Sequence, residues 1–496
     1  MPNTPILLIA INARYGHCAF AARSLLANLG VLRSQADLIE SDLDAQPFQL
    51  AAEIVGRAPQ VVGFSVYLWN VQIVRETLAI LHRVAPQLHL VLGGPEIVAE
   101  HAAAWHGLAD DLVVGEGETA FRTICDEVLR TRSAPASTED ATEALQIVAA
   151  AGGRGVSREA RLRIAAPEDL SLLVLPYELY TDADIAHRTI FVEGSRGCPF
   201  PCAYCTSGNT GLRTIPLSRL LPELDRLLER GVRAFRFLDR SLNASDEMAC
   251  GVLDFFLARH PVRLQLHFEI MPCRLNASLR QRLAAFPPGV LHLEAGVQTL
   301  NPGVAQGIGR KVPNDTLLET LAFLAHETGA IVHADLIFGL PGEDVQSFAA
   351  GFDHLVRTYN FPELQVNLLK RLPGTALARE ARFDRLVFNP HPPYELLASD
   401  VLDFAEVSRM QQFARCWELV HNRGRFPRAA ALLWQTGQAS PFQRYQMLAE
   451  QIYAAEGRMH ALGVARLSAH ITEFLQKTCG LSAVAAQAAV AADLSK

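Results

Sequence analysis

Short apolar runs recur along the first 130 residues, separated by stretches with the period of amphipathic helices. Apolar runs of four to six residues bounded by small or polar residues are typical of buried strands. Strands are expected at Ile6–Ile11, Val61–Val66, Leu88–Leu92 and Asp111–Val114, and a less regular one at Ala36–Asp42. This alternation predicts a doubly wound, Rossmann-like parallel sheet that binds ligands at the carboxyl ends of its strands.

The same alternation returns between residues 186 and 375. Six repeated units of strand and helix predict a partial (β/α)6 barrel, whose chemistry belongs at the carboxyl ends of its strands. The expected strands are Thr189–Val192, Ala234–Leu238, Gln265–Ile270, Val290–Val297, Ile331–Phe338 and Leu364–Leu369.

From residue 376 the pattern becomes helical, which predicts a mainly α-helical C-terminal domain. The expected helices are Tyr394–Gln412, Arg415–Asn422, Arg428–Gln435, Gln446–Glu456 and Leu462–Lys477. Small, polar and glycine-containing stretches between the two sheet regions are typical of a linker. The expected organisation is therefore a Rossmann-like domain at 1–135, a linker at 136–185, a barrel at 186–375 and a helical domain at 376–496.

Composition narrows the class of protein. Half of the 496 residues are hydrophobic and a fifth are charged, as in a soluble globular protein. The net charge of −7 provides no attraction to nucleic acid or anionic membranes, so the basic run His421–Arg428 is expected to be a solvated loop. Nine cysteines without a regular disulfide-like spacing favour a reducing cytoplasm. The run Ile6–Ile11 is too short to span a membrane and lacks the features of a signal peptide.

The clearest candidate for a cofactor-binding motif is Cys198-Pro-Phe-Pro-Cys202-Ala-Tyr204-Cys205, in which three cysteines have the spacing C-x3-C-x2-C. Three soft thiolates suit iron–sulfur ligation, and three rather than four leave one iron of a [4Fe–4S] cube without a protein ligand. A closed zinc site would need a fourth Cys or His nearby, which the loop does not offer. A disulfide with a spare thiol would imply an oxidising compartment. The iron–sulfur interpretation is therefore favoured.

With the aromatic Tyr204 before the last cysteine, this stretch resembles the signature of the radical S-adenosylmethionine (radical SAM) superfamily. The resemblance implies that Cys198, Cys202 and Cys205 hold the cluster and that its open iron binds SAM. It also implies an external one-electron reductant of the flavodoxin or ferredoxin type. The reduced cluster would then cleave SAM to methionine and a 5′-deoxyadenosyl radical.

Polar residues at the predicted strand ends resemble the branch that includes the oxygen-independent coproporphyrinogen oxidases, in which corresponding residues contact SAM. An arginine fork can pair with the methionine carboxylate, and carboxylates and amides can bind the amine and ribose hydroxyls. Asp239 ends the strand where this superfamily often binds the SAM amine, although the usual Gly-Gly-Glu is absent. The expected SAM contacts are Tyr204, Asp239, Glu269, Gln298, Arg310 and Asp335.

The order of features in the N-terminal region resembles the cobalamin-binding domain that precedes many radical SAM cores. The best-known version carries D-x-H-x-x-G with the histidine as lower cobalt ligand, but Asn12, Arg14 and His17 stand here. An arginine cannot give up its proton to become a ligand, so cobalamin is expected to bind without a protein ligand to cobalt, with His17 as the alternative. The expected cobalamin contacts are Asn12, Arg14, Ser65, Gly93, Gly94 and Gly115.

These resemblances together imply a cobalamin-dependent methyltransferase acting on an unactivated carbon or a phosphinate-like phosphorus of a small-molecule or peptide substrate. One alternative is a rearrangement or ring-forming reaction with cobalamin as an electron relay or relic. A second is methylthiolation of tRNA, which needs another cysteine triad in the N-terminal domain, where only Cys18 and Cys125 occur. A third is a non-enzymatic cobalamin sensor, against which the cysteine loop argues.

Overall fold

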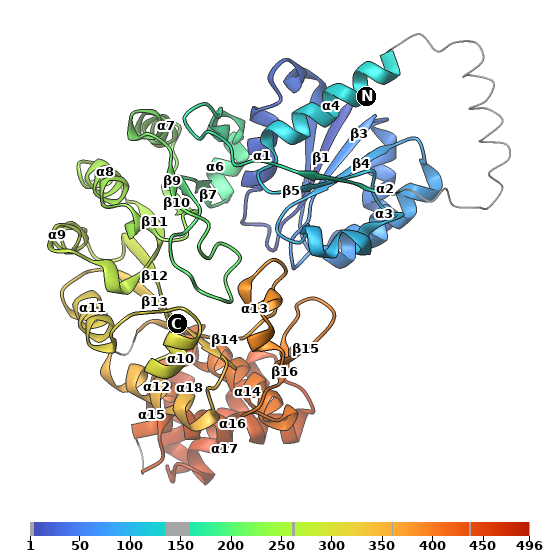
Figure 1. Cartoon of the computed structure of the whole chain (residues 1–496). Helices are drawn as coiled ribbons and strands as arrows, with labels where there is room; N and C mark the ends of the chain where they lie inside the picture. Colours follow the sequence, from blue (N-terminus) through green and yellow to red (C-terminus); the bar gives the residue numbers. More distant parts are fainter. Residues whose placement is uncertain (1–3, 134–158, 260–262, 360, 436–437, 496) are drawn as a thin grey trace. The chain divides into compact units, whose positions relative to one another are not determined.

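The computed structural model describes residues 4–133, 159–259, 263–359, 361–435 and 438–495 (Figure 1). The chain divides into two compact units. Residues 1–193 and 213–236 form the first, and residues 194–212 and 237–496 form the second. The fold class expected from the sequence is confirmed, with two mainly parallel six-stranded sheets followed by a helical C-terminal region.

The sheet of the first unit is parallel throughout, in the order β2-β1-β3-β4-β5-β6. Its strands are β1 (Ile6–Ile11), β2 (Ala36–Ser41), β3 (Val61–Ser65), β4 (His89–Gly93), β5 (Asp111–Val114) and β6 (Arg161–Ile164). The five strands expected from the apolar runs are present within one residue of their predicted ends. Strand β6 was not expected, because its residues lie in the stretch interpreted as a linker.

Charge rather than apolar burial holds β6 in the sheet. The side chains of Arg161 and Arg163 form ion pairs of 2.8 Å each with the fully buried carboxylate of Asp111 on β5. These contacts and the hydrogen bond from His89 hold the pKa of Asp111 near 2, although burial alone would raise it. A hydropathy pattern cannot reveal a strand held in this way.

Helices cover both faces of the first sheet (Figure 1). Helices α2 (Pro47–Gly56) and α3 (Val71–Val84) pack on the face that contains Leu7 and Ile9. Helices α1 (Phe20–Ala27) and α4 (Glu118–Ser133) pack on the opposite face. The shorter elements before residue 190 are η1 (Gly30–Gln35), η2 (Ala99–Trp105), η3 (Pro176–Leu179) and α6 (Asp182–His187).

The second sheet has the order β14-β13-β12-β11-β10-β7, as expected for a partial barrel. Its strands are β7 (Ile190–Val192), β10 (Ala234–Phe237), β11 (Gln265–Ile270), β12 (Leu291–Gln298), β13 (Ile331–Phe338) and β14 (Glu363–Leu368). Strict alternation along β12 buries Leu291, Leu293, Ala295 and Val297 and leaves polar residues and Gly296 half-buried on the other face. That second face carries the candidate chemistry.

Helices follow the strands of this sheet in the expected alternation. They are α7 (Leu217–Glu229), α8 (Asp246–Leu257), α9 (Ala277–Ala284), α10 (Pro302–Gly307), α11 (Asn314–His326) and α12 (Val345–Thr358). The short elements are β8 (Ser195–Arg196), β9 (Arg213–Thr214), η4 (Leu242–Ala244), η5 (Pro272–Arg274), α13 (Ala376–Arg379), η6 (Ala381–Phe383), β15 (Val387–Phe388) and β16 (Leu396–Ala398).

The C-terminal region is helical, as expected. It consists of α14 (Phe404–Trp417), the π-helical turn η7 (Glu418–Asn422), α15 (Pro427–Gln435), α16 (Pro441–Glu456), α17 (Val464–Lys477) and α18 (Ala483–Leu494). The predicted start of the first helix at Tyr394 was wrong, because Asp403 and Glu406 form a capping box that begins the helix at Phe404. Among the described residues, no helix is both long enough and apolar enough to cross a membrane.

The turn η7 covers the open edge of the second sheet. Strand β14 is the last strand of that sheet, so its outer backbone groups lack a strand partner. The carbonyl oxygen of Leu364 accepts hydrogen bonds from Trp417 Nε1 (2.6 Å) and Asn422 Nδ2 (3.1 Å). The Leu364 amide donates in return to Asn422 Oδ1 (3.2 Å). Two side chains of the C-terminal region thus take the place of a neighbouring strand.

We predict that Asn422→Ala loosens β14 locally. Loss of two partly buried hydrogen bonds should cost about 1–3 kcal/mol, so the amides of residues 363–368 should exchange with deuterium roughly 5 to 150 times faster. Native-state hydrogen exchange with mass spectrometry measures this directly. Gln411→Ala removes an exposed hydrogen bond to Glu395 from the neighbouring helix and should leave β14 unchanged. Equal exchange in all three proteins would contradict the covering role of η7.

Candidate active site

The three cysteines lie on one tightly folded loop. Cys198 and Cys202 are buried and Cys205 is half-buried. The loop closes on itself through hydrogen bonds from the Thr210 amide to the Cys198 carbonyl and from the Cys198 amide to Thr210 Oγ1, both 3.1 Å. Gly197 has a φ of +87°, and a Cβ there would lie 1.8 Å from the Gly211 carbonyl oxygen. The loop geometry therefore requires glycine immediately before the first cysteine.

Asp239 holds the beginning of this loop. Its Oδ2 accepts the Gly194 amide hydrogen bond (2.8 Å), and its Oδ1 accepts one from Ser195 Oγ (2.5 Å). The carboxyl is almost completely buried, and burial raises its pKa to about 6 against the opposing effect of both hydrogen bonds. Asp239 was expected to bind the SAM amine, whereas in the structure both of its carboxylate oxygens accept hydrogen bonds from the loop.

Arg310 lies beside the cysteine loop as a buried cation. Its guanidinium contacts Cys202 Sγ (3.8 Å) and Met271 Sδ (3.5 Å), and donates to the Gly296 carbonyl. In the described part of the chain it forms no ion pair with a carboxylate. A buried charge without a counterion is costly, so this position fits a site that receives negative charge. Cluster thiolates or the carboxylate of SAM would supply that charge.

Gln298 is strained and incompletely bonded. It has a φ of +71° at the β-bulge that interrupts the pairing of β12 with β13. Its Oε1 is buried and has no hydrogen-bond partner in the described structure. A Cβ on Gly296 would lie 2.7 Å from Gln298 Nε2, so glycine at 296 gives this side chain its room. Strain and an unused acceptor together are typical of a side chain that binds a ligand.

Glu269 and Asp335 lie on the same half-buried face of the sheet. The charge of Glu269 reaches Cys205 and adds to the effect of burial in raising the pKa of that thiol. Asp335 is buried, and its Oδ1 lies 3.3 Å from His333 Nε2. Burial raises the pKa of Asp335. Burial would lower the pKa of His333, but its contacts with Asp335 outweigh this and raise it to about 9.

Sequence reasoning missed the histidines on this face. His333 pairs with Asp335, and His267 Nε2 lies 3.1 Å from Glu294 Oε2 on the adjacent strand. The signal was present in β11, β12 and β13, where pairs of polar residues stand two positions apart: His267 and Glu269, His292 and Glu294, and His333 and Asp335. Residues two apart in a strand point to the same face, so this spacing also indicates that these polar side chains share one face.

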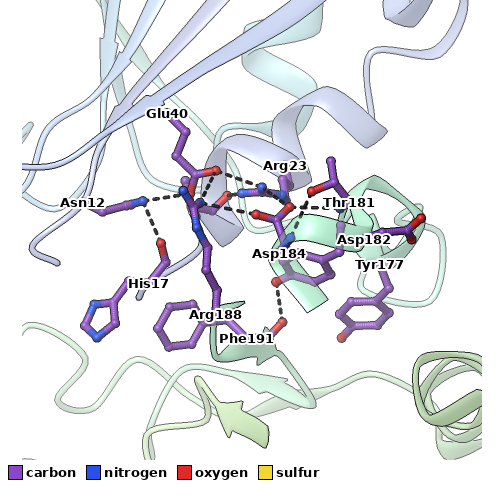
Figure 2. Close-up of polar contacts among 12 residues, drawn as sticks. Asn12, His17, Arg23, Glu40, Tyr177, Thr181, Asp182, Asp184, Arg188 and Phe191 are labelled. Carbon is purple, nitrogen blue, oxygen red and sulfur yellow. Dashed lines mark hydrogen bonds and ion pairs between the residues drawn. The ribbon is translucent and has the colours of Figure 1, made fainter. Parts of the chain in front are cut away.

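In the first unit, the residues after β1 are held by the largely buried carboxylate of Glu40 (Figure 2). Glu40 accepts hydrogen bonds from Asn12 Nδ2 (2.7 Å) and the Ala19 amide. It also forms ion pairs with Arg23 (2.8 Å) and Arg188 (3.1 Å). Burial alone would raise the pKa of Glu40, but these partners outweigh it and hold the pKa below its usual value.

The same network continues to the segment that precedes the second sheet. Arg23 pairs with Asp184 (2.9 Å), and Asp184 closes a capping box with Thr181 at the start of α6. Arg188 lies 3.4 Å from Asp184 as well (Figure 2). Two cations and two anions, all largely buried, thus tie residues 181–188 to the residues after β1.

The three side chains after β1 that were considered as cobalamin contacts differ in whether they already bind other parts of the protein. The Asn12 amide is used by Glu40 and by the His17 carbonyl (2.9 Å). Arg14 is exposed. The His17 ring packs edge-on against Phe191, with ring centroids 5.4 Å apart, and its backbone bridges to Thr189. Of the three, Arg14 is the side chain that remains available to a ligand.

The glycines of the first sheet serve backbone packing. Ser65 ends β3 and is buried, and the following amide donates to the Gly93 carbonyl (2.7 Å). A Cβ on Gly94 would lie 2.5 Å from the Val66 carbonyl oxygen, and one on Gly115 would lie 2.8 Å from the Ala165 carbonyl oxygen. Protein backbone thus approaches Gly94 and Gly115 closely, at positions where a ligand was expected to approach.

No three His, Cys, Asp or Glu side chains among the described residues converge closely enough to hold a single metal ion. A cubane cluster does not require such convergence, because each of its cysteines binds a different iron. Three thiols on one loop beside a buried guanidinium therefore fit a cluster. The edge of the first sheet, with Arg14 free and Ser65 at the end of β3, fits a cofactor larger than a metal ion.

Three known families match successive parts of the chain. Residues 9–125 match the family described as B12 binding domain. Residues 192–355 match the Radical SAM superfamily. Residues 384–491 match the family described as Protein of unknown function (DUF4080).

Among curated proteins, the 2-(S-pantetheinyl)-carbapenam-3-carboxylate methyltransferase of Streptantibioticus cattleyicolor is 26% identical over 344 residues, which are 64% of this chain and 48% of that protein. The tRNA-2-methylthio-N(6)-dimethylallyladenosine synthase of Cereibacter sphaeroides is 28% identical over 220 residues, 43% of this chain and 49% of that protein. The chain thus spans about half the length of these relatives.

Two solved structures share the fold. OxsB, a cobalamin-dependent S-adenosylmethionine radical enzyme with aqua-cobalamin and S-adenosylmethionine bound, has a TM-score of 0.65 at 12% identity, covering 99% of this chain and 80% of that one. The radical S-adenosylmethionine methyltransferase TsrM from Kitasatospora setae, with cobalamin and a [4Fe–4S] cluster bound, has a TM-score of 0.54 at 18% identity, covering 75% and 73%.

We predict that the pair of His333 and Asp335 makes stability depend on pH. Because the pKa of His333 is raised in the folded state, its contribution is complete below about pH 6.5 and is lost as the pH rises through about 9. His333→Gln should therefore lower the melting temperature at pH 6 more than at pH 9.5, with about 1–3 kcal/mol of stability lost at pH 6. His106→Gln, at an exposed position, is the control. A pH-independent effect of His333→Gln would contradict the assignment.

Proposed function

We propose that this chain, which belongs to the radical SAM superfamily and carries an N-terminal B12 binding domain, is a cobalamin-dependent radical SAM methyltransferase. One observation carries the proposal: the C-x3-C-x2-C loop lies beside the buried guanidinium of Arg310, which has no carboxylate partner among the described residues. The B12 binding domain match before the loop and the Radical SAM match that includes the loop support the proposal.

Cys198, Cys202 and Cys205 would hold the cluster, which supplies the electron that breaks a carbon–sulfur bond of SAM. Asp239 fixes the start of the loop by binding Gly194 and Ser195, so the thiols are positioned before any cofactor binds. The buried loop excludes water from the thiols, two of which are less than 10% exposed.

Five residues would position SAM around that cluster. Arg310 can bind its carboxylate, because its planar fork matches carboxylate geometry. Gln298 can accept a hydrogen bond from the amine or a ribose hydroxyl through its unused Oε1. Glu269 and Asp335 offer carboxylates on the same face, and Tyr204 offers an aromatic surface beside Arg310.

Cobalamin would carry the methyl group between SAM and substrate, bound at the carboxyl edge of the first sheet. Arg14, Ser65 and Gly93 would contribute to that edge, while the Asn12 amide holds the loop after β1. The two similar solved structures contain cobalamin, and a curated relative is a methyltransferase. The substrate would be a small molecule or peptide, the electron donor a flavodoxin or ferredoxin, and the compartment the reducing cytoplasm.

The similarity to a methylthiotransferase favours methylthiolation of tRNA as a second candidate. That chemistry needs a second cluster, and the first unit contains only Cys18 and Cys125, both buried. Iron analysis separates the two proposals: about four irons per chain support the methyltransferase, and about eight support the methylthiotransferase.

We predict that the protein, reconstituted anaerobically with iron, sulfide and cobalamin and supplied with SAM and a low-potential one-electron reductant, forms 5′-deoxyadenosine and transfers a labelled methyl group from SAM to reduced cobalamin. Replacing Cys198, Cys202 and Cys205 with Ala should abolish the broad iron–sulfur absorbance and SAM cleavage while retaining cobalamin binding. Cys250→Ala, which removes a half-buried thiol from α8, should change neither. A full complement of iron and sulfide in the triple variant would refute the ligand assignment.

We also predict that no protein side chain ligates the lower face of cobalt. Arg14 cannot donate a lone pair, and His17 packs against Phe191. Electron paramagnetic resonance of bound cob(II)alamin should therefore lack nitrogen superhyperfine splitting from the protein. Such splitting in the wild type, lost in His17→Ala, would identify His17 as the ligand and overturn the prediction.

A further inference from the structure

The cysteine loop is in direct contact with two other segments of the second unit. The carbonyl of Ala203, inside the loop, accepts a hydrogen bond from the amide of Leu377 on α13 (2.8 Å). The Ala203 amide donates to the carbonyl of Ile308, just after α10 (2.9 Å). A Cβ on Gly309 would lie 2.2 Å from the Pro201 carbonyl oxygen, so the backbone after α10 lies against the loop. A protein that docks on α13 or on the residues after α10 therefore comes close to the three cysteines.

Both segments are basic, although the chain as a whole is acidic. Residues 370–385 contain five lysines and arginines but two acidic residues, whereas the whole chain has a net charge of −7. In the segment after α10, Lys311 is exposed. A third contribution comes from η5, where the guanidinium of the exposed Arg274 lies 5.8 Å from the centre of the Phe200 ring in the cysteine loop. These exposed cations form what we call the basic patch: Arg274, Lys311, Arg371, Arg379, Arg382 and Arg385.

The members of the basic patch differ in what they already bind. Arg382 Nη1 donates to the Gly307 carbonyl (3.0 Å), which links η6 to the end of α10, and Glu380 offsets its charge through an ion pair of 2.5 Å. Lys311 and Arg385 form no hydrogen bond or ion pair with any other residue that the structure describes. Their charges therefore remain available to a partner.

The proposed reaction needs one electron from outside the chain for each SAM that is cleaved. Flavodoxins and ferredoxins, the expected carriers, are small and strongly acidic. A chain with a net charge of −7 repels such a carrier unless a local excess of positive charge attracts it. Electron-transfer complexes are weak and small, so a patch of a few side chains is sufficient. The basic patch supplies this attraction on segments that touch the cysteine loop.

We propose that the basic patch is the docking site of an acidic one-electron carrier of the flavodoxin type. The proposal rests on the proposed function, because it gives the electron donor a place on this chain. One electron leaves the anionic flavin hydroquinone of the carrier, which becomes the neutral semiquinone, and reduces [4Fe–4S]²⁺ to [4Fe–4S]⁺. No bond forms between the two proteins, and charge complementarity determines where they meet.

Binding of oxidised flavodoxin to the reconstituted protein, measured by isothermal titration calorimetry, tests the site without turnover. The double variant Lys311→Glu with Arg385→Glu exchanges two attractive charges for two repulsive ones. It should weaken binding by roughly tenfold or more at low ionic strength. The difference should vanish at about 1 M salt, where the Debye length is about 3 Å.

The matched control is Arg425→Glu with Arg458→Glu, which reverses two exposed arginines of the C-terminal helical region. It changes the net charge of the chain equally and should retain the wild-type affinity. Circular dichroism establishes that each variant is folded. Should the double variant of the patch not fold, the single variants Lys311→Ala and Arg385→Ala decide.

The rate of 5′-deoxyadenosine formation gives a second readout that separates docking from chemistry. Flavodoxin hydroquinone and dithionite are compared as reductants, because dithionite is small and needs no docking site. In Lys311→Glu with Arg385→Glu, the ratio of the flavodoxin-driven rate to the dithionite-driven rate should fall by roughly tenfold. The control double variant should keep the wild-type ratio.

Three other results contradict specific parts of this account. Equal flavodoxin affinity and an equal ratio of rates in the wild type and both double variants would overturn the docking site and leave the proposed function intact. Failure of the wild type to form 5′-deoxyadenosine with dithionite would instead refute the proposed function. Binding of total tRNA that Lys311→Glu with Arg385→Glu loses, while flavodoxin binding stays unchanged, would assign the basic patch to nucleic acid and also overturn the proposal.

Discussion

The largely buried carboxylate of Glu40 is the group on which the polar network of the first unit depends. Glu40 accepts hydrogen bonds from the Ala19 backbone amide and the Asn12 side chain, and it forms ion pairs with two arginines, Arg23 and Arg188 (Figure 2). The carboxylate of Asp184 balances the second positive charge. Removing one member of such a network leaves a buried charge uncompensated, at a cost of about 3–5 kcal/mol. The network joins two parts of the chain, residues 12–40 and residues 184–188, and Glu40 and Asp184 lie more than 140 residues apart in sequence. The loop after β1 and the segment around α6 are therefore ordered together.

Charges in the second unit are arranged differently. Asp239 is buried, and its hydrogen bonds to Gly194 and Ser195 are within the protein. Arg310 is buried as well, but it contacts sulfur atoms and a carbonyl instead of a carboxylate. Asp239 has hydrogen-bond donors for both of its oxygens and therefore holds the loop. Arg310 has no carboxylate partner among the described residues and can therefore receive an anion. Gln298, with its unused acceptor and positive φ, belongs to the second kind.

Patterns of apolar residues predicted much of the fold, because strands such as β11 and β13 are short alternating runs that need no distant partner to be recognised. The cysteine loop was likewise readable, since its ligands are close in sequence. Contacts between distant residues were not readable. Strand β6 depends on Asp111, and the role of Asn12 depends on Glu40. Gly94 remained ambiguous, because a missing Cβ admits a ligand or another backbone equally well.

The C-terminal helical region affects the candidate site through one strand. Trp417 and Asn422 bind the backbone of Leu364, which fixes β14 at the edge of a barrel that does not close. The register of β14 against β13 places Glu363 opposite His333 and Gln365 opposite Asp335. His333 contacts both Gln365 (2.9 Å) and Asp335 (3.3 Å). A shift of β14 by one residue would turn Gln365 to the other face of the sheet, away from His333, because alternate residues of a strand point in opposite directions. The helical region therefore maintains the polar face of the barrel by holding the register of its last strand.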